Sequence, residues 1–562
     1  MKKDSTSISS APVEGTPSLF DSATGLKQRA MVDIYADDDE DAIDPVYQAK
    51  ARLLNEAIQE IGMGRYQASY WSPTSKATIF TSYILRQWSL FLVAGFGWFA
   101  DSVWPLLSGL ILAPVLSEFS FNGPFLSLAA NIGLLVGAVV WGVGCDIWGR
   151  RWSFNLTLLI TGIFGLSAGG AANFVSLASL IAVVGVGVGG NMPVDSAVFL
   201  DMVPGTHQYL LTVMSVWWAF GQLVVSLIAW PFIANFSCNP SSATCARKDN
   251  MGWRYLLFTL GALTLFMWGL RFFVFTLLES PRYLIGLNKD EEAVEVIRKL
   301  AERNGTKTTL TVTHLREAQA LVTEKYSREI DSAGSVYGVG QLEPANRHAI
   351  LSKSSVYGVG HIKALFRTRK LAWSTTLLTA LWGIIGLAST LYNNFLPFIL
   401  NSRGTAFGDG SLNTTYRNLF YPSLEFLALY SPVGLWNHHG SVAEAHSRFP
   451  PARLTGAFLL ATTTARSSNA LLGWNCAYAF TSNIMYGVLY ALSPEVFPAK
   501  DRGTGNGLVS TATRVFGVIA PVIALYADLK TAVPVYIAGA LIMAAGGMSL
   551  LLPYEPRGKA SI

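Results

Sequence analysis

Ionisable residues inside apolar stretches are where this 562-residue sequence could do chemistry. Asp101, in the segment GWFADSVW, lies about 13 residues beyond Trp88, which places it roughly 20 Å along a helix that crosses a hydrocarbon layer about 30 Å thick. A charge at that depth costs about 2.5–3.5 kcal/mol, so it favours a functional role, as a proton carrier or as a partner for a substrate cation. The alternative is a static ion pair, for which Arg514, about halfway along a later apolar run, is the candidate partner.

Polar residues of the fourth apolar run are the next candidates. Helix packing accounts for its closely spaced glycines. Asn191 and Asp195 are four residues apart and share a helix face, and Pro193 loosens the backbone between them. We therefore expect the two side chains to line the solute cavity near the cytosolic end of that cavity. Five further residues are candidates for contact with the solute, although the aromatic ones could instead only pack in the core. These candidates are Gln222, Trp382, Tyr392, Asn393 and Asn394.

A charged turn with the sequence GVGCDIWGRR joins two apolar runs over residues 142–151. An acid at one helix end, with paired arginines a turn later, can bind the N-terminal dipole of a neighbouring helix and the carboxylates of another loop. Such contacts hold only while two helix bundles touch on that side. The alternative is that these residues only set topology and cap helix ends.

No nucleotide-driven or metal-dependent chemistry is indicated. The sequence lacks a G-x-x-x-x-G-K-[ST] loop, and its seven His and four Cys residues form no credible metal set or catalytic triad. We therefore expect no enzymatic activity, no metal and no cofactor.

The composition is that of an all-α, polytopic membrane protein. Hydrophobic residues make up 51% of the chain and charged residues 14%, with a mean hydropathy of +0.37, whereas soluble domains carry roughly 25% charged residues. The net charge of +5 comes from cations spread among loops, which indicates a lipid bilayer rather than nucleic acid as the partner.

About 20 apolar residues cross a bilayer, and this rule predicts two bundles of six helices. The clear spans are 88–115, 125–144, 152–172, 175–199, 209–234, 253–277, 371–400, 469–492, 504–527 and 532–553, whereas the eighth and ninth helices are poor. The predicted domains are a mostly disordered cytosolic tail (1–85), an N-terminal bundle (86–278), a cytosolic central loop with an amphipathic helix over Asp290 to Arg303 (279–370), a C-terminal bundle (371–554) and a cytosolic tail (555–562).

Basic residues in the short loops orient the chain. By the positive-inside rule they put both termini and the central loop in the cytosol. The opposite side then receives Cys238 and Cys245, which could pair in an oxidising compartment, and the glycosylation sequon at Asn413.

Three motifs give the chain a resemblance to a known family. They are Gly142 to Arg151 after the second helix, Glu279-Ser280-Pro281-Arg282 after the sixth, and Pro494 to Pro498 followed by Arg502-Gly503-Thr504-Gly505 before the eleventh. With these motifs the sequence resembles a major facilitator superfamily transporter of the synaptic-vesicle-protein-like and sugar-porter-like branch, and fungal members in particular.

The resemblance implies a solute site at the midplane between two six-helix halves, and a set of gating residues. Asp146, Arg150 and Arg151 would stabilise the outward-facing state, and Glu495 and Arg502 would form a related charge network in the second half. The complete gating set is Gly142, Asp146, Gly149, Arg150, Arg151, Glu279, Arg282, Glu495 and Arg502.

The resemblance is interrupted between about Leu419 and Arg453. Glu425, two prolines and the run Asn437-His438-His439 make a poor span, and the family's second glycine-and-arginine turn is missing. The simplest explanation is a stretch (419–453) translated in the wrong frame or a mistaken exon boundary; true divergence is the alternative.

The function expected from the sequence is secondary transport of a small organic solute across the plasma membrane. The solute would be a sugar, an organic acid or a related carboxylate. Asp101 would couple it to protons. Export of a fungal secondary metabolite is one alternative. A transporter-like sensor or a defective product is the other.

Overall fold

The computed structural model describes residues 45–62, 89–204, 207, 210–238, 245–275, 277–333, 365–408, 411–423, 451–497, 502–526 and 531–552. Some helical residues are described by their backbone alone, among them Asp146, Glu495 and Arg502. The segment 424–450 lies outside the described residues, and so does most of the break at 419–453.

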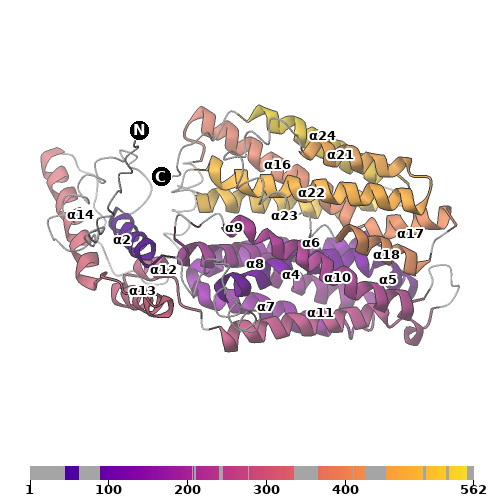
Figure 1. The fold of residues 1–562 in the computed structure, drawn as a ribbon, viewed down its shortest axis with the longest axis horizontal. Coiled ribbons are helices and arrows are strands. Elements are labelled where there is room, and N and C mark those ends of the chain that lie inside the picture. Colours follow the sequence, from indigo (N-terminus) through magenta and orange to yellow (C-terminus); the bar gives the residue numbers. More distant parts are fainter. Residues whose placement is uncertain are drawn as a thin grey trace, which may run out of the picture.

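The first half of the chain forms a bundle that Figure 1 shows in indigo to magenta. Its helices are α4 (Ser89–Leu110), α5 (Leu112–Glu118), α6 (Pro124–Trp148), α7 (Arg150–Ala168), α8 (Phe174–Met202), α9 (Leu210–Val213), α10 (Ser215–Phe236) and α11 (Gly252–Gly269), which runs into a π-helical turn, η3 (Leu270–Val274).

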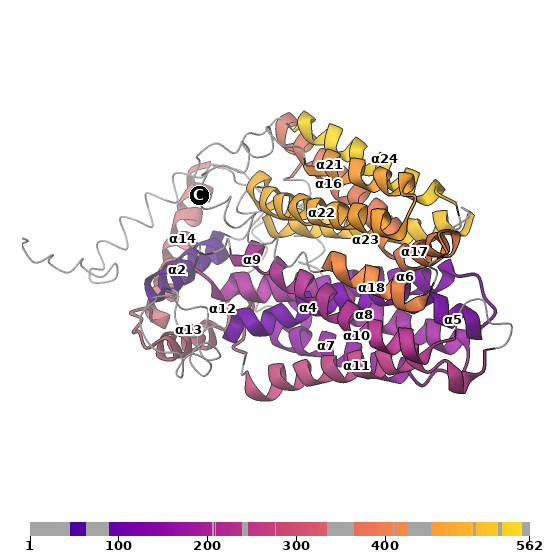
Figure 2. The ribbon, with the colours of Figure 1, turned by 45° about the vertical axis from the view of Figure 1, so that its right-hand side comes forward.

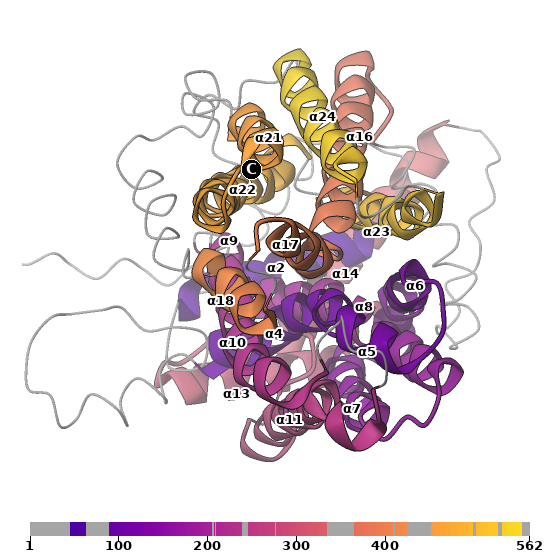
Figure 3. The same ribbon diagram turned by 90° about the vertical axis from the view of Figure 1, so that its right-hand side faces the viewer.

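The second half lies against the first and appears in orange to yellow (Figure 1). It contains α16 (Arg369–Asn393), α17 (Leu396–Ala406), α18 (Leu412–Ser423), α21 (Pro451–Ala461), α22 (Ser468–Val496), α23 (Arg502–Tyr526) and α24 (Val533–Met548). Viewed from the end, the two halves form separate groups of helices (Figure 3). They meet where α6 packs on α23, α10 on α18, α4 and α5 on α17, and α9 on α22.

The described part of the chain agrees with the predicted all-α membrane fold. Within it, eight helices are long and apolar enough to cross a membrane: α4, α6, α8, α10, α11 with η3, α16, α23 and α24. Helix packing explains the glycines of α8 as expected, because a Cβ added to Gly189 would lie 2.2 Å from the carbonyl oxygen of Leu134 in α6.

The two ends of the bundle carry different structures. At one end, which we call the disulfide end, Cys238 and Cys245 form a disulfide bond. At the other, the central-loop end, α12 (Pro281–Gly286), α13 (Asp290–Asn304) and α14 (Val312–Ala333) pack together with α2 (Pro45–Ile61) (Figure 2). Helix α13 spans the residues of the predicted amphipathic helix, Asp290 to Arg303, whereas α2 was not expected from the sequence.

Candidate functional site

Asp101 and Arg514 form an ion pair between the two halves of the bundle. Arg514 on α23 donates from Nη2 to Oδ1 of Asp101 on α4 over 2.5 Å. The Asp101 side chain is 1% exposed, and its Oδ2 has no hydrogen-bond partner in the described structure. A half-satisfied buried carboxylate is costly, which makes this pair the centre of the candidate site.

Aromatic side chains of the two halves pack together one helical turn from Asp101. The ring of Trp98, one turn before Asp101, lies 5.7 Å from that of Tyr490, and the ring of Trp382 lies 4.9 Å from that of Tyr490. Trp382 also donates from Nε1 to Ser493 Oγ over 2.8 Å. On α10, the Trp218 ring lies 5.7 Å from that of Tyr486. These contacts place aromatic faces where the halves meet, an arrangement suited to stacking on a flat solute.

Asn191 on α8 is the clearest unfilled hydrogen-bonding group near the pair. It is fully buried, and neither its Nδ2 nor its Oδ1 has a hydrogen-bond partner among the described residues. A Cβ on Gly97 of α4 would lie 3.2 Å from the Asn191 Cβ, so Asn191 packs beside the turn that carries Trp98 and Asp101. A buried amide without partners is rare, and a bound solute is one way to satisfy it.

Asp195, one turn beyond Asn191, has a different environment from the one expected. Instead of lining a cavity, its carboxylate accepts two hydrogen bonds from Arg271, 2.8 Å from Nη2 and 3.3 Å from Nη1, and both side chains are fully buried. Arg271 also donates to the carbonyl oxygens of Val93 and Phe154. The π-helical turn η3 holds Arg271 inside while Phe273 beside it is exposed, so the pair joins α4, α7, α8 and η3.

Gly97→Ala is expected to destabilise the protein by about 1–3 kcal/mol, because the added methyl group would lie 1.7 Å from Asp195 Oδ2 and would displace the buried carboxylate. The melting temperature of the purified protein in detergent measures the effect. Gly473→Ala on α22 is the matched control, since nothing lies within 4 Å of its added Cβ. Equal melting temperatures for the two variants would contradict the predicted clash.

Contacts between the halves continue at the disulfide end. Asn394 donates from Nδ2 to Ser127 Oγ over 2.7 Å, and a Cβ on Gly109 would lie 2.3 Å from the Asn394 carbonyl oxygen. The Tyr416 hydroxyl donates to the carbonyl oxygen of Leu110. These contacts join the two halves at this end.

The other predicted contact residues of the second half point elsewhere. The Tyr392 hydroxyl donates to Asn475 Oδ1 over 2.5 Å, and Asn393 Oδ1 accepts from Tyr478 over 3.4 Å, both within the second half.

Gln222 is half-buried on α10, one turn beyond Trp218, and so shares the face that meets the second half. Asn413 is exposed at the disulfide end, and its Oδ1 accepts from Trp230 over 2.7 Å; its glycosylation stays a prediction.

At the central-loop end, charged residues of the gating set converge on one carboxylate that the sequence had not singled out. Asp201, at the end of α8, forms an ion pair with Arg150, accepts from Ser280 Oγ over 2.6 Å, and lies 3.7 Å from Nη1 of Arg282. Burial lowers the pKa of Arg282 and the charge of Arg150 lowers it further, while Tyr47 opposes them. We call Arg150, Asp201, Glu279 and Arg282 the charge network.

Glu279 completes this network by capping α7. Its Oε1 accepts from the backbone N–H groups of Arg150 (3.1 Å) and Arg151 (3.4 Å), where the helix dipole favours an anion. Gly149 adopts a φ of +97°, which turns the chain sharply between α6 and α7. Gly142 has open space around it, and the side chains of Asp146, Glu495 and Arg502 lie outside the described residues. All contacts of the network given above lie within the first half and the central loop.

Comparison with known proteins places the chain in a family. The profile of the family described as "Sugar (and other) transporter" matches residues 123–330. "MFS siderochrome iron transporter 1" of Ceriporiopsis subvermispora is 62% identical over 93% of this chain and 93% of its own length. "Major facilitator-type transporter hxnZ" of Emericella nidulans is 37% identical over 92% of this chain and 88% of its own length.

The fold agrees with this assignment. The xylose transporter XylE from E. coli, in a partially occluded inward-open conformation, matches 84% of this chain and 99% of its own with a TM-score of 0.60 and 14% sequence identity. Together with the relatives, whose similarity spans nearly the whole sequence, this shows that the chain belongs to the major facilitator superfamily of multi-pass membrane transporters.

Proposed function

We propose that this protein is a proton-coupled secondary transporter of a small organic acid or a related carboxylate, with its solute site between the halves at Asp101 and Arg514. The observation that carries the proposal is the buried ion pair that joins α4 to α23, with one carboxylate oxygen unpartnered. Protonation of Asp101 would release Arg514, and a solute carboxylate would take its place. The two events would then be coupled because they compete for one guanidinium group.

The surrounding residues support this solute class. Asn191 offers both a donor and an acceptor, and the rings of Trp98, Trp218, Trp382 and Tyr490 offer apolar faces. Sugars stay within the proposal because hydroxyl groups would also satisfy Asn191. Two relatives are named for their solutes: siderochrome iron and, at 23% identity in Acinetobacter baylyi, niacin, which is itself an aromatic carboxylate. Both belong among the solutes to be tested.

Alternating access would follow from the way the halves meet. Asn394 with Ser127, and Tyr416 with Leu110, join the halves at the disulfide end. If the positive-inside expectation holds, this end is extracellular, the termini and α12–α14 are cytosolic, and the conformation faces inward. In the outward-facing state the halves would close at the central-loop end, and the charge network would then gain partners from the second half. We propose the plasma membrane as the location and 86–278 and 371–554 as the two bundle domains.

Flux measurements on purified protein in lipid vesicles test the proposal. The solutes would be a sugar, an aliphatic carboxylate, niacin and a ferric siderochrome, each offered with and without an inward proton gradient. We expect carboxylate accumulation that requires the gradient. Binding of a solute without flux would contradict the proposal and would favour the sensor; gradient-dependent export alone would favour an efflux transporter.

A further inference from the structure

Helix α2, close to the start of the described chain, packs on the central-loop end through a continuous apolar face. Leu54, Ala57, Ile58 and Ile61 follow helical spacing and are buried. The hydrophobic cluster they join includes residues of α13 and α14 and continues to Cys145 of α6. The cluster therefore connects a segment before the first predicted span with the interior of the first half.

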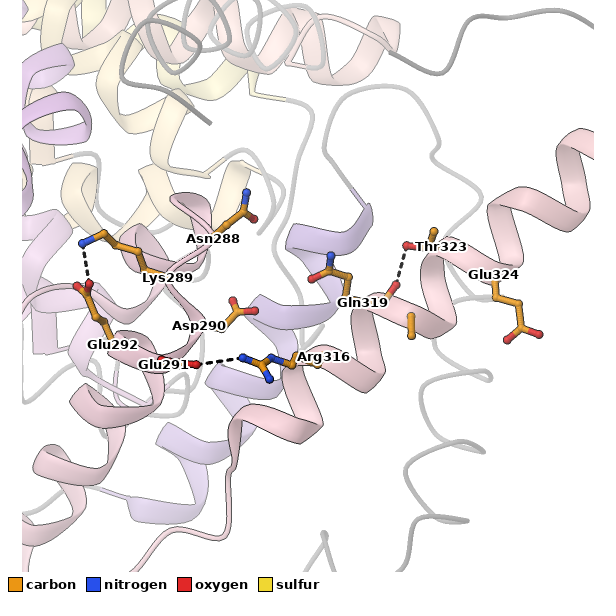
Figure 4. A pocket seen from close by; sticks show the side chains of 10 residues that line it. Asn288, Lys289, Asp290, Glu291, Glu292, Arg316, Gln319, Thr323 and Glu324 are labelled. Atoms are coloured by element: carbon orange, nitrogen blue, oxygen red, sulfur yellow. Dashed lines mark hydrogen bonds and ion pairs between the residues drawn. The ribbon is translucent and has the colours of Figure 1, made fainter. Parts of the chain in front are cut away.

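A buried ion pair anchors one end of α2. Lys50 Nζ lies 2.7 Å from Oδ2 of Asp290, and the two side chains are 2% and 13% exposed. Figure 4 shows the Asp290 carboxylate directed toward α2. Asp290 also lines an open pocket of about 950 Å³ with residues at the start of α13 and on α14. The other ion pairs at this pocket, Lys289 with Glu292 and Arg316 with Glu291, are exposed and contribute little. A buried lysine depends much more strongly on its partner.

The middle of α2 holds Arg282 of the charge network. Asn55 Oδ1 accepts hydrogen bonds from Nε (3.2 Å) and Nη2 (2.7 Å) of Arg282. The remaining terminal nitrogen, Nη1, is the one that lies 3.7 Å from Asp201. Because a guanidinium group is planar and its donors have a fixed geometry, Asn55 determines how Arg282 faces Asp201 and Arg150.

We infer that α2 is an intramolecular clamp on the gate, in which Lys50 and Asn55 are positioning residues for the charge network. With α2 docked, Arg282 is held between Asn55 and Asp201, and Arg150 keeps its own contact with that carboxylate. When α2 detaches, Arg282 loses its fixed orientation and the apolar face of α2, which includes Ala57, opens to water. Any event that displaces α2 would thereby change the opening of the central-loop end. The inference goes beyond the proposed function. The first test of the inference, described next, does not depend on the proposed function.

Alkylation by maleimide of a cysteine introduced on the buried face of α2, by Ala57→Cys, measures docking without any solute, because Ala57 is fully buried. Cys145 and Cys476 are first replaced by alanine, so that the introduced thiol is the only one outside the disulfide bond of Cys238 and Cys245. Lys50→Glu, which places two carboxylates together, is expected to speed alkylation about fivefold or more. Lys50→Glu with Asp290→Lys should return the rate close to that of the parent. This recovery separates loss of docking from misfolding.

Asn55→Ala tests the link to the gate, with Gln59→Ala, also exposed on α2, as the matched control. Solute uptake in vesicles should change about fivefold in maximal rate at an unchanged KM in Asn55→Ala, whereas Gln59→Ala should behave as the parent. The inference is overturned if Lys50→Glu leaves the thiol of the Ala57→Cys protein protected, if the double variant does not recover, or if Asn55→Ala transports at the parent rate. Absence of solute uptake by the parent protein would instead count against the proposed function.

Discussion

Arg271→Met is expected to destabilise the protein by about 3–5 kcal/mol, the largest stability effect of any single substitution considered. The substitution leaves the fully buried Asp195 carboxylate without its cation, and it also removes the donors to the carbonyl oxygens of Val93 and Phe154. No water reaches these groups to replace the lost hydrogen bonds, since both side chains are 0% exposed. The yield of monodisperse protein and its melting temperature in detergent measure the loss.

Two further variants make this prediction specific. Arg271→Met with Asp195→Leu should recover most of the stability, because removing both charges also removes the unpaired carboxylate. Arg316→Met breaks an ion pair whose side chains are 65% and 77% exposed, and it should cost less than about 1 kcal/mol. A single Arg271→Met variant as stable as Arg316→Met would show that the buried pair does not hold these helices together.

Arg514→Gln is expected to have the largest effect on solute affinity, raising the KM for a carboxylate about a hundredfold. Glutamine keeps hydrogen-bonding capacity but loses the charge that the proposal assigns to the solute. Arg514→Lys, which keeps the charge without the planar fork, should give an intermediate KM. Initial uptake rates in vesicles, measured over a range of solute concentrations, provide both values. An unchanged KM in Arg514→Gln would mean that Arg514 serves only as the static partner of Asp101.

The central pair was within reach of sequence analysis because a membrane core makes each charge conspicuous. Asp101 and Arg514 stand alone in long apolar runs, and the cost of an unpaired charge there suggests that one is the partner of the other. Asn191 was identified for a similar reason, as an amide among glycines. That none of its neighbours forms a hydrogen bond with the Asn191 side chain follows from how α4 and α8 pack, and only the structure shows this packing.

Arg271 and Asp201 were missed because both occur near helix ends, where charges are ordinary. In the segment LRFFV, Arg271 resembles a residue that only sets topology; the π-helical turn that directs it inward has no sequence signature of its own. Asp201 resembles one more acid before a loop, and only the fold brings it to Arg150 and Ser280.

Helix α2 did have a signal that could have found it. Lys50, Leu54, Ala57, Ile58 and Ile61 repeat at helical spacing in a tail that otherwise reads as acidic and polar. The central loop that covers this face is more than 200 residues away in the sequence, as the separation of 240 between Lys50 and Asp290 shows. Periodicity could predict the helix, but not its partner.

Solute accumulation driven by a proton gradient, compared between the parent protein and Asp101→Asn in the same vesicles, tests the central claim most directly. Asparagine cannot carry the proton, so accumulation should be lost while exchange of solute at equal pH on both sides continues. Continued exchange would show that the variant is folded and binds its solute. Accumulation in Asp101→Asn that matches the parent would contradict coupling through the Asp101–Arg514 pair.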